Sequence, residues 1–208
     1  MVEICIIDYG MGNLRSIQKG LEKAGAKAVL TSKVADVKNA GAIVLPGVGA
    51  FEDAIKNLKN GGFVDVIREK ISQGTPFLGV CLGLQLLFES STEGGHFDGL
   101  KILPGIVDRF PASLKVKVPH MGWNSLIYKD PGHFLLEGIP DGTYMYFVHS
   151  FHPITNPENI VATAIHGHEF ACIVKNKAGN LVATQFHPEK SSSAGIKMLE
   201  NFHKFCQR

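Results

Sequence analysis

The sequence predicts an α/β fold: an open, mixed and mostly parallel sheet with helices on both faces and additional antiparallel strands in the C-terminal half. Two observations carry this prediction. In the first half, short and almost wholly apolar runs alternate with segments of helical spacing, which is typical of parallel strands buried on both faces. In the second half, strand-like runs follow one another with few helices between them, which favours antiparallel pairing.

The first half is predicted to supply the parallel strands and the helices that join them. Buried strands are expected where apolar residues run without interruption, at residues 4–7, 28–30, 42–45 and 77–80. Helices are expected where apolar residues recur at helical spacing, as in Leu14, Ile17 and Leu21 and later in Phe63, Ile67 and Ile71.

The second half is predicted to extend this sheet or to form a subsidiary layer. Strand-like runs lie at residues 101–107, 114–118, 144–148, 160–165, 170–174 and 181–185. A final helix is expected to start near the serines at 191–193 and to carry a buried face of Leu199, Phe202, Phe205 and Cys206. Because no repeat, low-complexity tract or long linker divides the chain, residues 1–208 are predicted to form one domain.

Composition narrows the class of partner. The formal net charge is only +2 and the basic residues are scattered, so we expect neither nucleic acid nor an anionic membrane surface as partner. The apolar runs are far shorter than the ~20 residues that span a bilayer. The first eight residues have neither the basic region nor the cleavage site of a signal peptide, so a cytoplasmic protein is expected.

A nucleophile elbow is indicated at residues 77–89, which read Phe-Leu-Gly-Val-Cys-Leu-Gly-Leu-Gln-Leu-Leu-Phe-Glu. An apolar strand leads into Cys81, and an apolar helix is expected to follow. Gly79 and Gly83 suit the sharp turn because a Cβ at either position would clash. The helix N-terminus would favour a thiolate at Cys81. The alternative is a structural cysteine buried in a strand–helix corner.

Two further segments complete a candidate catalytic set. In Gln-Phe-His-Pro-Glu, Pro188 biases His187 toward an extended conformation, so that Glu189 can reach the imidazole and fix its tautomer while the other ring nitrogen acts as a base for Cys81. In Leu-Pro-Gly-Val-Gly-Ala, residues 45–50, backbone N–H groups can face an oxyanion.

The candidate oxyanion donors are Val48 and Gly49 in that loop and Leu82 after the nucleophile. A plain turn or a phosphate loop are the alternatives for residues 45–50, and the absence of a following Lys-Ser/Thr argues against the latter. We further expect the loop from Pro46 to Gly49 to rest with an N–H turned away and to flip on activation, because glycines lower the cost of reorienting a peptide.

With these segments the chain resembles the class I (triad) glutamine amidotransferases, which have a flavodoxin-like fold. Within them it is similar to the glutaminase subunits of imidazole glycerol phosphate synthases. That closer resemblance is carried by residues 7–13 (Ile-Asp-Tyr-Gly-Met-Gly-Asn), 119–124 (Pro-His-Met-Gly-Trp-Asn), 146–150 (Tyr-Phe-Val-His-Ser) and 186–191 (Phe-His-Pro-Glu-Lys-Ser), which together span nearly the whole chain. Phe151 departs from the family, which often has Tyr there.

The resemblance implies that Cys81 attacks the side-chain amide of L-glutamine, His187 carries the proton, and a glutamyl thioester is hydrolysed to glutamate. Ammonia passes to a cyclase subunit with a (β/α)8 barrel, which this chain must bind as a separate protein and which makes imidazole glycerol phosphate and a purine precursor in histidine biosynthesis. No cofactor and no metal are implied.

The resemblance also assigns residues around the triad. The implied glutamine-binding residues are Gly47, Val48, Gln85, Glu93, His149 and Ser150. The implied partner-interface and ammonia-exit residues are Asn13, Met121, Trp123 and Tyr146, although a packing role in the core suits Trp123 equally.

Other readings stay open at this point. A glutaminase that serves anthranilate or pyridoxal phosphate synthesis would share the triad but is not expected to carry the segments at 119–124 and 146–150. A non-catalytic interaction subunit would need no intact Cys–His–Glu set. The spacings His149-x-x-His152 and His166-x-His168 resemble metal ligands, but no cysteine or carboxylate completes them.

Overall fold

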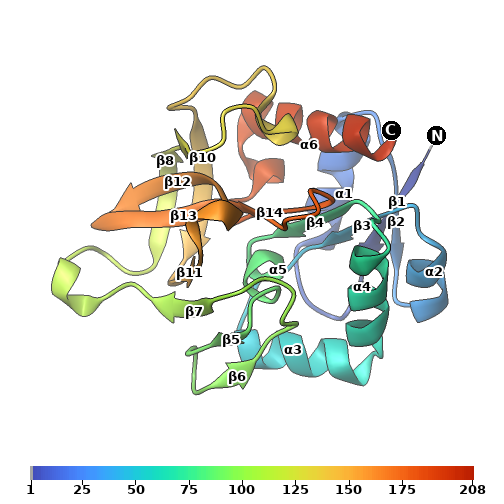
Figure 1. Ribbon diagram of the computed structural model, residues 1–208, viewed down its shortest axis with the longest axis horizontal. Helices are drawn as coiled ribbons and strands as arrows, with labels where there is room; N and C mark the ends of the chain where they lie inside the picture. The colour runs from blue at the N-terminus through green and yellow to red at the C-terminus, as the bar shows by residue number, and fades with distance from the viewer. Residues whose placement is uncertain (1) are drawn as a thin grey trace.

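The computed structural model describes residues 2–208 and contains the predicted mixed sheet (Figure 1). Within that range the strand order is β2-β1-β3-β4-β14-β13-β12-β9. Neighbours from β2 to β14 pair in parallel, and β13, β12 and β9 continue the sheet antiparallel, which confirms the predicted fold class. The strands are β1 (Glu3–Ile7), β2 (Lys27–Thr31), β3 (Ala42–Leu45), β4 (Phe77–Val80), β9 (Ile127–Tyr128), β12 (Ile160–His166), β13 (His168–Lys175) and β14 (Leu181–Thr184).

Helices cover both faces of this sheet because each presents one apolar stripe to it. Helices α1 (Leu14–Lys23) and α6 (Ser192–Cys206) pack on one face through residues such as Leu21 and Phe202. Helices α2 (Val34–Asn39), α3 (Phe51–Asn60) and α4 (Phe63–Ser72) pack on the other. Of these, α2 and α3 were not predicted from the sequence.

Two smaller sheets lie at the end of the molecule remote from α2 (Figure 1). One pairs β8 (His120–Ser125) with β10 (Tyr144–His149) antiparallel. The other has the order β11-β7-β5-β6, with β5 (Ser90–Ser91), β6 (Phe97–Asp98), β7 (Ile106–Arg109) and β11 (Phe151–Ile154). These sheets carry β10 and β11 to the carboxyl ends of the parallel strands, where the elbow lies.

Two predicted strands are wrong. Most of residues 101–107 is irregular, since Lys101 has φ 52° and the backbone N–H groups of residues 100–103 donate to carbonyls of residues 86–88 instead of to a strand. Residues 114–118 begin in a 3-10 turn, Ala112–Leu114, and Lys115 has φ 52°. Their alternation of apolar and basic residues resembles a strand, but no partner strand lies beside them.

The helix after the elbow is also shorter than predicted, because α5 covers only Leu82–Gln85. The chain then turns, and the segment at 99–103 supplies the N–H groups that satisfy the carbonyls at its end. The helix-dipole argument for a thiolate at Cys81 is correspondingly weak, since one turn sums few peptide dipoles.

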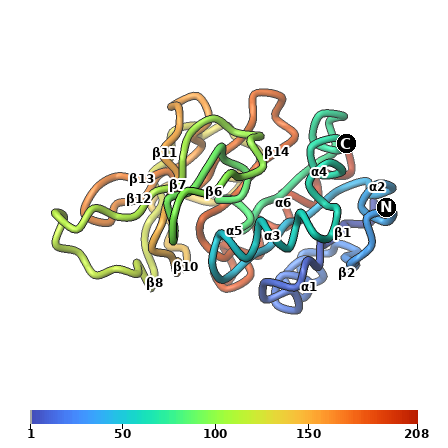
Figure 2. The backbone as a smooth tube through the Cα atoms, turned by 90° about the horizontal axis from the view of Figure 1, so that it is seen from below, coloured from blue at the N-terminus to red at the C-terminus, as the bar shows by residue number. Residues whose placement is uncertain are grey.

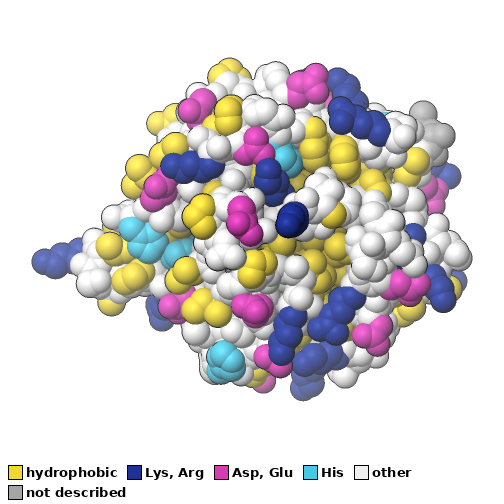
Figure 3. Space-filling view, in the orientation of Figure 1, with side chains coloured by type: hydrophobic (Ala, Val, Ile, Leu, Met, Phe, Trp, Pro, Cys, Tyr) yellow, Lys and Arg dark blue, Asp and Glu magenta, His cyan; other side chains and the backbone are white. Residues whose placement is uncertain are grey.

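The chain ends lie side by side on the edge formed by the first strands (Figures 1 and 2), where the Val2 N–H donates to Gln207 Oε1 at 3.2 Å. Acidic and basic side chains are interspersed on the face shown in Figure 3. Over residues 2–208, every helix is too short or too polar to cross a membrane.

Candidate active site

Cys81 occupies a strained turn between β4 and α5. Its backbone has φ 56° and ψ −109°, a conformation that a residue with a Cβ rarely adopts and that is typical of a nucleophile elbow. A Cβ at Gly83 would lie 1.8 Å from the Leu45 oxygen, and a Cβ at Gly79 would lie 2.9 Å from the Gly83 oxygen. The predicted reason for both glycines is confirmed.

His187 and Glu189 form a buried pair beside the elbow. His187 Nδ1 lies 2.8 Å from Glu189 Oε1, and the two side chains are 2% and 3% exposed. His187 Nε2 is buried and makes no hydrogen bond among the described residues. Burial lowers the pKa of His187, but interactions with Cys81 and Glu189 outweigh it and raise that pKa to about 9.

The Cys81 sulfur is held by two polar groups. Its thiol lies 3.9 Å from the Val148 carbonyl oxygen, and Gln185 Nε2 donates to the sulfur at 3.8 Å. The other cysteines lie outside this site, and burial raises the pKa of Cys5 and Cys206 to about 12. Cys81 is the thiol that has a histidine–carboxylate pair beside it.

The glycine-rich loop does not present an open oxyanion site. The N–H of Leu82, one of the predicted donors, donates to the Gly47 carbonyl oxygen at 3.3 Å. In a trans peptide the C=O and N–H point in opposite directions. Because Gly47 C=O faces the elbow, the N–H of Val48 faces away from it. Gly49 has φ +111°, which only glycine adopts readily.

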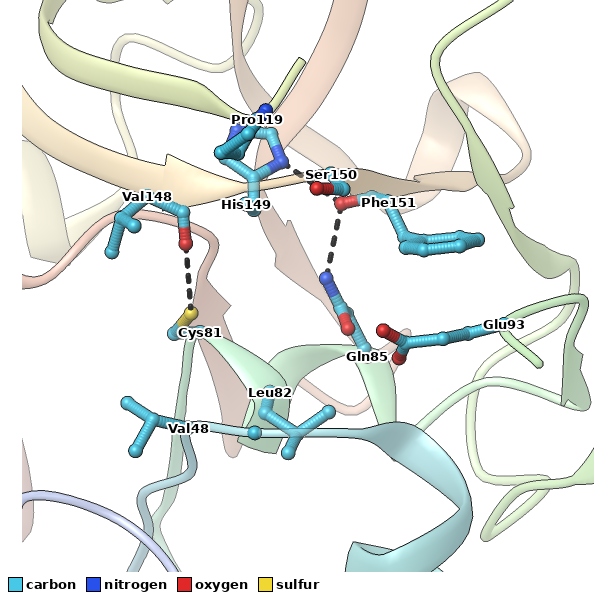
Figure 4. Close-up of a pocket in the computed structure, with 11 residues that line it drawn as sticks. Val48, Cys81, Leu82, Gln85, Glu93, Pro119, Val148, His149, Ser150 and Phe151 are labelled. Carbon is cyan, nitrogen blue, oxygen red and sulfur yellow. Dashed lines mark hydrogen bonds between the residues drawn. The ribbon is translucent and has the colours of Figure 1, made fainter.

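A cavity of about 260 Å³ opens next to Cys81 (Figure 4). It brings together the predicted nucleophile, Cys81, and most of the residues predicted to bind glutamine or an oxyanion: Val48, Gly49, Leu82, Gln85, Glu93, His149 and Ser150. Gly47, in the same loop, is not among the lining residues, and a Cβ at this position would lie 2.6 Å from the Tyr9 hydroxyl and 2.8 Å from Leu82 Cβ.

Two acceptors face this cavity from the elbow side. Gln85 Nε2 donates to the Phe151 carbonyl at 3.0 Å and to Gln185 Oε1 at 3.2 Å, which uses both amide hydrogens and leaves its oxygen free. Glu93 Oε2 accepts from the N–H of Phe51, at the start of α3, at 2.9 Å. An ammonium group entering the cavity would therefore meet an amide oxygen and a carboxylate.

The residues predicted to face a partner lie on the surface. Met121 and Trp123 of β8 are 62% and 51% exposed, so the alternative of a core role for Trp123 is wrong. The Trp123 ring meets Tyr146 of β10 edge-on, with centroids 6.0 Å apart. Asn13 is exposed immediately before α1.

The histidines with ligand-like spacing are arranged differently from a metal site. His152 Nε2 and His168 Nε2 lie 3.1 Å apart and hydrogen-bond to each other, while His149 lines the cavity beside Cys81. Across residues 2–208, no group of three or more His, Cys, Asp or Glu side chains could hold a metal ion.

Two residues without a role predicted from the sequence also lie at the site. The Tyr9 hydroxyl donates to the Pro46 carbonyl at 2.9 Å and so fixes the start of the glycine-rich loop. Gln185 links Cys81 to Gln85. Both lie in or beside the segments that carry the family resemblance, but only the folded chain shows what they contact.

Residues 5–205 match the family described as glutamine amidotransferase class-I, and the chain belongs to that family. Solved structures share its fold. They include the structure of PurLQS from Thermotoga maritima, with a TM-score of 0.75, 19% identity and 99% of each chain covered. Another is the Trypanosoma brucei CTPS glutaminase domain with bound acivicin, with a TM-score of 0.71 at 13% identity, covering 100% of this chain and 94% of that one.

Curated relatives narrow the family to the HisH subunits of imidazole glycerol phosphate synthase. The HisH subunit of Geobacter metallireducens is 50% identical over 97% of this chain and 98% of its own. The HisH subunit of Methanosarcina mazei is 50% identical over 99% of this chain and 100% of its own. Within the class I amidotransferases, the chain is therefore a glutamine-hydrolysing subunit of the HisH type.

Proposed function

We propose that Cys81, His187 and Glu189 hydrolyse L-glutamine and that the ammonia is passed to the cyclase subunit of an imidazole glycerol phosphate synthase, for histidine biosynthesis in the cytoplasm. Residues 1–208 act as one amidotransferase domain. The observation that carries the proposal is the buried His187–Glu189 pair, 2.8 Å apart, beside a cysteine on a strained elbow.

The reaction begins with attack of the Cys81 sulfur on the amide carbon of glutamine. The thiol proton goes to His187, whose cationic form the Glu189 carboxylate stabilises. The tetrahedral intermediate collapses as His187 returns the proton to the amide nitrogen, so that ammonia leaves and a glutamyl thioester remains. Water, deprotonated by His187, then attacks the thioester and releases glutamate and the thiol.

The cavity accounts for recognition of glutamine. The Gln85 amide oxygen and the Glu93 carboxylate accept the hydrogens of the substrate α-ammonium group, while His149 and Ser150 form the opposite wall (Figure 4). Val48 limits the cavity on the loop side, and Gly47, which precedes it, is proposed to contribute through the same loop. Charge complementarity between an ammonium and a half-buried carboxylate supports an α-amino acid as substrate.

The oxyanion loop is proposed to switch. In the resting arrangement Leu82 N–H is occupied by the Gly47 carbonyl at 3.3 Å and Val48 N–H is turned away. A flip of the Gly47–Val48 peptide frees the first donor and brings in the second, with Gly49 absorbing the change in backbone angles. Glutaminase activity then depends on how far the flipped loop is stabilised, and we propose that binding of the partner stabilises it.

The partner is proposed to be a separate cyclase subunit with a (β/α)8 barrel, giving a heterodimer. The exposed apolar side chains of Met121 and Trp123, with Tyr146 beside them, support a docking surface on β8 and β10. Asn13, exposed immediately before α1, is proposed to belong to the same interface. Ammonia would leave the site toward it.

The test is glutamate release from glutamine by this chain mixed with an imidazole glycerol phosphate cyclase and its nucleotide substrate, with Cys81→Ala in parallel. Release that requires the cyclase and is lost in Cys81→Ala is the expected result. Equal glutamate release by Cys81→Ala would contradict the catalytic role of the triad. Glutamate release at the same rate with and without the cyclase would contradict the proposed partner.

A further inference from the structure

One carbonyl beside the glutamine cavity accepts two side-chain hydrogen bonds. The Phe151 oxygen accepts from Gln85 Nε2 at 3.0 Å and lies 2.8 Å from His149 Nδ1 (Figure 4). A carbonyl oxygen can only accept, so His149 carries a proton on Nδ1. In the neutral ring the other nitrogen, Nε2, is then an acceptor.

The tautomer of the neighbouring ring, His120, is fixed in the same way. His120 Nδ1 lies 2.9 Å from His149 Nε2, so His120 must donate from Nδ1 and its own Nε2 is left as an acceptor. Asn124 Nδ2 lies 3.2 Å from His120 Nε2 and donates to it. Hydrogen bonds therefore run in one direction from Asn124 through His120 and His149 to the Phe151 carbonyl.

Backbone groups also fix the orientation of the Asn124 amide. Its oxygen accepts from the Ser125 N–H at 2.9 Å, and its nitrogen donates to the Ile165 carbonyl at 2.8 Å. A flipped amide would lose both bonds. Main-chain groups thus fix both ends of this series of hydrogen bonds. Each of the two histidine rings between them has one tautomer that matches the donors and acceptors of its neighbours.

Burial keeps these rings neutral. His120 and His149 are each 6% exposed and pack against Phe147 and Phe170. Burial lowers the pKa of His120 to about 4 and that of His149 to about 3. A second proton on either ring would place two N–H groups against each other.

We propose that His120 and Asn124 are positioning residues for glutamine binding, which hold His149 in its Nδ1–H tautomer and thereby fix the carbonyl that orients the Gln85 amide. The proposal rests on the proposed function, because Gln85 is taken to present its oxygen to the substrate. Neither residue lines the cavity, and both act through His149.

The direct test is the tautomer of each ring, read from ¹⁵N chemical shifts of the full-length protein with labelled histidines at pH 7. His120→Gln and His149→Gln identify the signals. Protonation on Nδ1 and a bare Nε2 are expected for both rings. A proton on Nε2 of either ring would overturn the proposal, and this readout does not depend on activity.

Steady-state kinetics with the cyclase subunit test the consequence. His120→Phe keeps an aromatic ring but removes both hydrogen bonds, and it should raise the KM for glutamine roughly tenfold while kcat changes by less than about threefold. His120→Gln supplies one donor and one acceptor in the same order and should restore KM. Asn124→Asp offers only acceptors to His120, so it should raise KM as His120→Phe does.

His166→Phe is the matched control, because His166 stacks on His120 with centroids 4.3 Å apart but bonds the Lys117 carbonyl instead. It should leave KM and both tautomers unchanged. An unaltered KM in His120→Phe, or equal damage in His120→Gln, would contradict the positioning role. If glutaminase activity did not depend on Cys81, the proposed function would fail while the tautomer measurement still stood.

Discussion

At the scale of single residues, the catalytic chemistry depends on two short segments in which the important residues lie only two positions apart. Gly79 and Gly83 flank the nucleophile because a Cβ at either would meet backbone, and Pro188 sets the short step from His187 to Glu189. The result is a histidine whose pKa is raised to about 9 even though burial alone would lower it. The imidazole is therefore able to hold the proton that Cys81 gives up.

Glu189→Gln should remove the charge that stabilises the His187 cation and should lower the pKa of His187. We expect glutamate release to fall by roughly 10² to 10⁴ with little change in the KM for glutamine, because the carboxylate touches the imidazole and not the substrate. Initial rates of glutamate formation with the cyclase present measure this. Activity within about threefold of the unmodified protein would show that Glu189 is not needed, and a thermal unfolding scan controls for loss of fold.

Local spacing predicts the triad, the elbow glycines and the cavity side of Gln85, which lies one helical turn after Cys81. It does not predict the roles of Tyr9, His120, Asn124 or Gln185. Each of them has a partner 29 to 104 positions away, and the one short-range contact, from Asn124 to His120 four positions earlier, depends on how both side chains are oriented in the fold. The tautomer of a histidine in particular depends on its hydrogen-bond partners in the folded protein, and no periodicity in the sequence predicts it.

At the scale of elements, continuous apolar runs predict the parallel strands well because both faces of those strands are buried. Strands are wrongly predicted at residues 101–107 and at residues 114–118, where apolar residues alternate with basic ones. The first segment caps the carbonyls that follow α5, and the second passes over the surface beside no strand edge. β8 escapes prediction because its sequence mixes buried His120 with exposed Met121 and Trp123 and half-buried Gly122 and Asn124.

The elbow and β3 pack backbone against backbone, so Gly83→Ala should be strongly destabilising. Its Cβ would lie 1.8 Å from the Leu45 oxygen, and separating the two elements should cost about 3 kcal/mol or more. Urea unfolding measures this cost. Gly132→Ala is the control, since its Cβ would meet nothing closer than 4.0 Å and its φ is not positive. Equal stability of the two variants would contradict the contact.

At the scale of the whole molecule, buried neutral histidines make stability depend on pH. Burial lowers the pKa of His120, His133 and His152 to about 4 and that of His149 to about 3. Between pH 6.5 and pH 4 these histidines bind protons in the unfolded chain but stay neutral in the folded protein. Stability contributed by these rings is therefore fully present above pH 6.5, falls progressively below that pH, and is lost once the pH has fallen through 4.

Urea unfolding at pH 7 and pH 5 should accordingly show a lower free energy of unfolding at pH 5, with each of these rings contributing up to about 2 kcal/mol. His152→Gln should reduce the difference between the two pH values. His96→Gln, at an exposed position, should leave it unchanged. A free energy that rises from pH 7 to pH 5 would contradict the burial argument.

The proposed docking surface gives a further prediction at this scale. Trp123→Ala should weaken the complex with the cyclase at least tenfold, which is typical of a central aromatic at an interface. Ile154→Ala is the matched control, because Ile154 is also 51% exposed but lies on β11. Calorimetric titration compares the two, and equal affinities would place the interface elsewhere.

The hydrogen bond from the Leu82 N–H to the Gly47 carbonyl oxygen has a consequence for how much ammonia the free subunit loses to solvent. An intramolecular hydrogen bond of this kind contributes only about 1 kcal/mol of net stability, so its loss adds little to the free energy of the open loop. A conformer that lies a few kcal/mol higher is still populated at about 0.1 to 10%. On the proposed mechanism, an unpartnered subunit would therefore release ammonia to solvent at a small constant rate.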